Sequence, residues 1–161
     1  MKNYIYLFIF LAVLSSSCSE EPTPPFTAIS IMARITVLDA QGNNLLDPKR
    51  EGSFKANEIK IFYERNGKME EFYEGHLDMP RNFQIIPPEF GSDYLISVVL
   101  SEKTVIKWNT YEIDTLTAEI QRFEGENGGM HVRKVYHNGE LKHDSSTSMT
   151  RREFTIVKQR P

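Results

Sequence analysis

Cys18 is the one cysteine of the chain, and its thiol is the most reactive group in the sequence. A single thiol forms no disulfide within the chain, and it excludes a zinc site built from several cysteines. It follows an apolar run, residues 4–14, and three small residues, Ser15 to Ser17. The position of this cysteine, directly after the small residues, is the most informative feature of the chain.

The four histidines have no spacing typical of a metal site. They are His76, His131, His137 and His143. On one strand His131 and His137 would share a face, but six residues of strand extend about 20 Å, which exceeds the reach of one metal ion. We therefore expect surface or loop histidines and no metal site.

Asp39, Gln41 and Asn43 are spaced like the first half of a calcium loop. The twelfth position of such a loop, which should be acidic, is Arg50. We therefore expect a plain turn in this segment.

The sequence also has no pair of carboxylates spaced for catalysis and no known catalytic motif. Glu70 and Glu71 would point to opposite faces of a strand, so they cannot flank one glycosidic bond. The chain has no G-x-S-x-G elbow, no H-E-x-x-H helix and no glycine loop for phosphates or dinucleotides. The sequence therefore predicts no catalytic residues and no cofactor.

Trp108 and Tyr111 are the aromatic pair that could contact a ligand. Exposed together on one surface, they would suit stacking on a sugar ring or a peptide. The alternative is that Trp108, the one tryptophan of the chain, anchors the hydrophobic core.

The composition is that of one small globular domain. The chain has 161 residues, a formal net charge of -3 and 40% hydrophobic residues, which is sufficient for a packed core. The mild acidity argues against a nucleic-acid partner, which requires a basic face.

The first segment has the layout of an export signal, with Lys2 before the apolar run and small residues after it. Eleven helical residues rise about 16 Å, which is too short for a hydrocarbon core of about 30 Å. We expect a signal helix over residues 1–17, a lipidated cysteine and an extended proline-rich tether over residues 18–26, and a folded domain over residues 27–161.

From residue 28 the apolar side chains recur with the period of two that is typical of strands. One predicted face collects Ile29, Ile31, Ala33, Ile35 and Val37. Asn66-Gly67 and Asn138-Gly139 each predict a hairpin with a type I′ turn, because both residues of that turn need a positive φ. A two-residue loop at the first of them would place Ile61 opposite Phe72.

Further along the chain, residues 94–101 predict a central strand, because apolar side chains occupy both faces. Residues 104–123 predict two strands broken near Asn109, and residues 154–158 predict the last strand. About eight short strands separated by Gly and Pro breaks predict an all-β fold, an antiparallel β-sandwich, with a small β-barrel as the alternative.

Ser17-Cys18 resembles the end of a lipobox, in which a small residue precedes a cysteine whose sulfur receives a diacylglyceryl group. The leucine usual three positions before the cysteine is replaced by Ser15, and Leu14 stands one position earlier. The resemblance implies lipidation of Cys18 and an essentially permanent membrane anchor.

Ser19, Glu20 and Glu21 look like the short acidic export signal of Bacteroidetes-type surface lipoproteins. This resemblance implies a lipoprotein of the outer membrane with its domain on the outer face.

The segment Tyr94–Val98, preceded by Pro88 and Gly91, looks like the core strand of prealbumin-like and immunoglobulin-like sandwich modules of Gram-negative envelopes. Residues 105–109, 114–117 and 135–141 are similar to segments of small lipoproteins of uncharacterised function from the same bacteria. The resemblance implies the sandwich and brings no catalytic residues with it.

Together these features predict a lipid-anchored envelope protein that is not an enzyme. We expect a binding or structural module with a glycan or protein partner. An accessory subunit of an outer-membrane uptake or fimbrial assembly complex is the alternative. A small hydrolase would require perturbed carboxylates or histidines gathered in one pocket.

Overall fold

The structure is a computed structural model, and it describes residues 28–89, 93–124, 128–147 and 152–160. The predicted signal helix and tether lie outside these residues. All regular secondary structure in the described part is strand. No helix in it is long and apolar enough to cross a bilayer.

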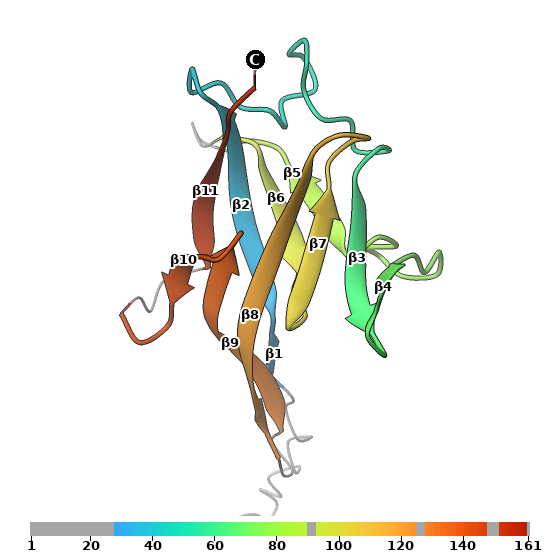
Figure 1. Cartoon of the computed structure of the whole chain (residues 1–161), viewed down its shortest axis with the longest axis vertical. Coiled ribbons are helices and arrows are strands. Elements are labelled where there is room, and N and C mark those ends of the chain that lie inside the picture. The colour runs from blue at the N-terminus through green and yellow to red at the C-terminus, as the bar shows by residue number, and fades with distance from the viewer. Residues whose placement is uncertain (1–27, 90–92, 125–127, 148–151, 161) are drawn as a thin grey trace, which may run out of the picture.

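The larger sheet has seven strands: β1 (Ala28–Ser30), β3 (Lys60–Arg65), β4 (Lys68–Glu71), β7 (Lys103–Lys107), β8 (Ile113–Phe123), β9 (Gly129–His137) and β10 (Glu140–Asp144). Their order is β1-β9-β8-β7-β3-β4, and β10 pairs with β9 further along than β1 does. The smaller sheet has four strands in the order β11-β2-β6-β5: β2 (Met32–Asp39), β5 (Phe83–Ile86), β6 (Leu95–Val99) and β11 (Glu153–Lys158). Figure 1 shows the two sheets as layers.

Both sheets contribute to one hydrophobic core. The period-two pattern of β2 buries Ala33, Ile35 and Val37 completely, as predicted. They belong to one cluster with buried side chains of β3, β6, β7, β8, β9 and β11. In the described part of the chain, the buried side chains of this core extend from Ala33 to Ile156.

Ile29 departs from its predicted place in this core, since 61% of it is exposed. The chain leaves the larger sheet after β1 and enters the smaller one at β2, with only Ile31 between them. The change of sheet interrupts the alternation, so the pattern of β2 cannot be continued back to Ile29.

Two expectations about the sheets are wrong. The sheets are mixed rather than antiparallel, because β1 pairs parallel with β9 and β11 pairs parallel with β2. Parallel neighbours need long connections, which local turn signals do not report. The alternative of a small barrel is also wrong, because neither sheet closes on itself.

The hairpins follow the prediction. Asn66 and Gly67 have φ values of 52° and 75°, and Asn138 and Gly139 have values of 48° and 88°. Phe72 N donates to Ile61 O at 2.8 Å, which confirms the predicted register.

The remaining strands also agree in place with their predictions. β6 is central in the smaller sheet, and β7 and β8 are separated by the break near Asn109. The count differs, since eleven strands occur in the described residues against about eight expected.

The domain has two distinct ends (Figure 1). Ala28 enters beside Gly129, at the lower tip where β8 and β9 meet. The loop between β2 and β3, the turn between β7 and β8, and the C-terminal residues lie at the upper end.

Candidate functional site

Four of the predicted functional residues, Cys18 and Ser19 to Glu21, lie outside the described residues. Lipidation and surface export therefore stay predictions.

Trp108 is fully buried, so the alternative in which it anchors the core is confirmed. Its ring stacks on Phe54 with centroids 5.0 Å apart. It offers no surface on which a sugar or peptide could stack.

Tyr111 has the opposite environment, with 91% of the residue exposed. It lies in the turn between β7 and β8, where Asn109 Oδ1 accepts hydrogen bonds from the backbone N–H groups of Tyr111 and Glu112, both at 2.8 Å. The structure therefore does not bring Trp108 and Tyr111 together on one surface. Contact between a ligand and Tyr111 stays a prediction.

The expectation of surface or loop histidines is wrong for two of the four. His143 is buried on β10, where a bulge between Leu141 and His143 shifts the strand register and changes which side chains face inward. His137 ends β9, and only 13% of its side chain is exposed. No group of three or more metal-ligating side chains gathers in the part of the chain that the structure describes.

The Asp39 segment is a turn, as expected. The Asp39 carboxylate accepts hydrogen bonds from the backbone of Gln41 and Asn43 and from the Asn43 side chain, at 2.8 to 3.0 Å. Its oxygens are thus engaged within the turn itself.

A buried carboxylate, Asp114, was not anticipated from the sequence. It shares the inward side of β8 with Leu116 and Ala118 and is 3% exposed. Trp108 Nε1 donates to Asp114 Oδ2 at 2.6 Å, and His137 Nε2 lies 2.9 Å from Oδ1. The signal that could have revealed it is a charged residue at an apolar position of a period-two strand.

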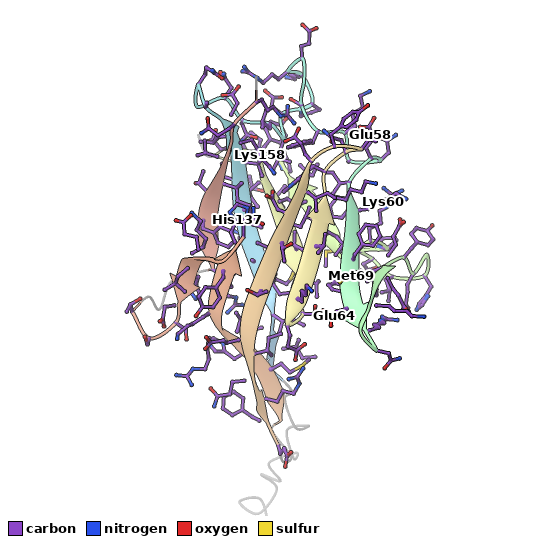
Figure 2. All side chains as sticks on the ribbon, viewed as in Figure 1. Glu58, Lys60, Glu64, Met69, His137 and Lys158 are labelled. Carbon is purple, nitrogen blue, oxygen red and sulfur yellow. The ribbon has the colours of Figure 1, made fainter. Side chains whose placement is uncertain are left out.

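Two further residues complete the cluster around Asp114. Asn138 Nδ2 donates to Oδ1 at 3.1 Å, and the Lys158 ammonium pairs with Oδ2. Lys158 belongs to β11, so this ion pair connects the smaller sheet to the larger one. Figure 2 shows Lys158 nearer the upper end than His137.

The surroundings of Asp114 favour its charged form. Burial opposes ionisation, but hydrogen bonds from His137 and Lys158 and the charge of Lys158 outweigh it. The hydrogen bond from Trp108 acts in the same direction. As a result the pKa of Asp114 lies far below its ordinary value, and the carboxylate is ionised at neutral pH.

Phe54 connects this cluster to the loop between β2 and β3. One neighbour of its ring is Trp108, and the Arg160 guanidinium lies 4.3 Å from the ring centre. Arg160 also pairs with Glu112 at 2.7 Å and donates to the Gly52 carbonyl at 2.5 Å. The contacts of Arg160 and Trp108 therefore fix the position of this loop on the domain.

A pocket of about 530 Å³ opens at this end of the domain, and we call it the end pocket. It is lined by nine residues of the loop 46–56, by Ile85 of β5 and by Tyr94. The Asn44 side chain donates to the Tyr94 carbonyl at 2.8 Å and accepts from Leu46 N at 2.8 Å, which joins the two walls. The pocket is therefore formed before any ligand binds.

The lining of the end pocket combines apolar surface with a few polar and charged groups. Leu46, Phe54, Ile85 and Tyr94 supply apolar and aromatic surface, while the lining residues include no histidine and no cysteine. The cluster around Asp114 has a histidine, but its groups bond to one another in the interior. The end pocket has a hydroxyl, that of Ser53, with the charged groups of Glu51 and Lys55 also in its lining.

Comparisons of the chain with protein-family models, with curated proteins and with solved structures find no match.

Proposed function

We propose that the chain is a lipid-anchored outer-membrane protein whose domain is a non-catalytic binding module facing the cell exterior. The single observation that carries the binding role is the end pocket, a preformed and largely apolar cavity. The export signal, Cys18 and the Ser19 to Glu21 segment support the location.

The placement of the pocket agrees with this role. The chain enters the domain at the lower end, and the end pocket is built at the upper end (Figure 1). The eight residues of β2 that run between them extend about 26 Å. With Cys18 in the membrane, the pocket would face away from the lipid surface.

For the fold we propose a β-sandwich of the immunoglobulin-like or prealbumin-like kind. Two sheets that share one core support it. The parallel pairs at β1 and β11 are additions at the sheet edges that such a sandwich would have to accommodate.

Location and anchoring can be tested together on intact cells. A tag at the C-terminus should be removed by external protease, and fatty-acid labelling should be lost in Cys18→Ser. Protection of the tag until lysis would contradict an outward-facing domain, and labelling that survives in Cys18→Ser would contradict lipidation at this residue.

A second candidate function is an accessory subunit of an outer-membrane uptake or fimbrial assembly complex, because β5 offers a strand edge. In the described residues β5 pairs with β6 alone, and its sequence, Phe-Gln-Ile-Ile, has no charge to discourage a further strand. Another edge strand, β4, is Lys-Met-Glu-Glu, and three of its four side chains are charged. Gln84→Lys on β5 should abolish strand addition by a partner while leaving ligand binding in the end pocket intact.

A further inference from the structure

We propose that the end pocket binds an apolar molecule with an anionic group, of the fatty-acid type. This inference rests on the proposed binding role and names the chemistry of the ligand. The anionic group would lie against Arg50 and Lys55, and the apolar part against the aromatic wall.

The two cations at the pocket are only loosely engaged by the protein. Arg50 lies 3.4 Å from Asp39, whose oxygens are already bonded within their turn, and Lys55 lies 3.6 Å from Glu58. The Lys60 pair with Glu71, by contrast, is 2.8 Å long. The side chains of Arg50 and Lys55 are 38% and 72% exposed, so both can turn to a bound anion.

The charge of the lining also favours an anion. The lining has two cations, Arg50 and Lys55, and one acid, Glu51, so its net charge is two minus one, which is one positive charge. Asp39 and Glu58, which pair with these cations, do not line the pocket themselves.

Ser53 supplies a further polar contact. Its hydroxyl is buried and has no hydrogen-bond partner in the described part of the chain, although Ser53 lines the pocket. A buried hydroxyl without a partner is costly, and rotation of the Ser53 side chain toward the pocket would let a ligand oxygen satisfy it. The apolar wall beside it, which includes Phe54 and Tyr94, accounts for the remaining surface.

The test uses three probes with one ten-carbon chain and different head groups: decanoate, 1-decanol and decyltrimethylammonium. Binding to the chain from Ser19 onward is measured by calorimetry below the micellar concentration. The fluorescence of Trp108 is a second readout, because its ring stacks on the pocket residue Phe54. Decanoate should bind about tenfold more tightly than decanol and more tightly still than the cation.

Substitutions assign the binding to the pocket. Arg50→Gln should weaken decanoate about tenfold and leave decanol unchanged. Lys49→Gln removes the same charge next to the pocket but does not line it, so affinity should be unaltered. Glu51→Gln should strengthen decanoate, because it removes the one like charge from the lining.

Blocking the cavity distinguishes the preference for an anionic ligand from the broader proposal that the end pocket binds ligands. Ala56→Phe places a ring in the pocket from an exposed loop position and should abolish binding of all apolar probes, whereas Ala40→Phe in an exposed turn should not. Equal binding of the three probes, lost in Ala56→Phe, would overturn the anionic preference and leave the binding role standing. If no probe binds to folded protein, or if Ala56→Phe has no effect, the end pocket is not a site for such ligands.

Discussion

The Asp114 carboxylate collects four polar partners from both sheets, and its replacement tests how much they stabilise the fold. Asp114→Asn keeps the shape but leaves the Lys158 ammonium, which is 11% exposed, without an anion. Removing one partner of a buried ion pair typically costs about 3 to 5 kcal/mol. We expect a loss of this size in the free energy of unfolding, measured by urea denaturation.

The matched control is Glu102→Gln, which makes the same chemical change in an ion pair with Arg122 at 2.5 Å. Both of those side chains are more than half exposed, so the free energy of unfolding should change by no more than about 0.5 kcal/mol. Similar losses in the two variants would show that the burial of Asp114 has no energetic consequence.

The pH dependence of stability provides a second residue-scale prediction. The pKa of Asp114 is lower in the folded chain than in the unfolded chain. Its contribution to the free energy of unfolding is therefore full at a pH above the ordinary pKa of 3.8 and declines as the pH falls below that value. The difference in unfolding free energy between the wild type and Asp114→Asn should therefore shrink as the pH is lowered from about 4 to about 3. A gap that widens on acidification would contradict the lowered pKa.

Single residues also show where sequence reasoning succeeds and where it stops. The sequence alone allowed the alternative in which Trp108 anchors the core. It did not reveal that Asp114 is a buried partner of Trp108, because the residues that stabilise Asp114, Lys158 and His137, are 44 and 23 positions away. The pocket residues Arg50, Ser53 and Phe54 lie in a turn-rich loop without periodicity. Only the fold brings that loop against Ile85 and Tyr94.

The two Asn-Gly hairpins are alike in sequence and differ in what their turns contact, which permits an element-scale prediction. Asn138 Oδ1 accepts from Thr115 N at 2.8 Å, and its Nδ2 donates to Asp114, whereas the Asn66 side chain has no hydrogen bond in the described part of the chain. Glycine accepts a positive φ in either turn. Asn138→Gly should therefore cost about 2 kcal/mol of unfolding free energy, and Asn66→Gly should change it by less than about 0.5 kcal/mol.

Local elements were predictable because their causes are local. The alternation of β2, the two hairpins and the register of Ile61 with Phe72 depend on neighbouring residues. The parallel pairing of β11 with β2 joins Phe154 to Ile35, and no short-range signal specifies such a contact. Sheet order therefore had to come from the structure.

At the scale of the whole molecule, the opposite positions of chain entry and end pocket lead to a prediction about orientation. The protein has one cysteine, and lipidation would block its thiol. A second cysteine can then be introduced and labelled alone in vesicles. One variant is Ala40→Cys, in an exposed turn at the upper end, and the other is Phe123→Cys, at a residue that is 51% exposed near the lower tip. A dye at position 123 should transfer energy to a membrane-surface acceptor more efficiently than a dye at position 40.

The size of the domain makes this difference measurable. The eleven residues of β8 alone extend about 36 Å, and a domain standing on its lower end would separate the two dyes by a comparable height. Equal transfer from the two positions would mean that the domain lies flat, with the end pocket beside the lipid. In that case an apolar anion would reach the pocket from the membrane rather than from outside the cell, and decanoate should then compete with vesicle lipid for Arg50.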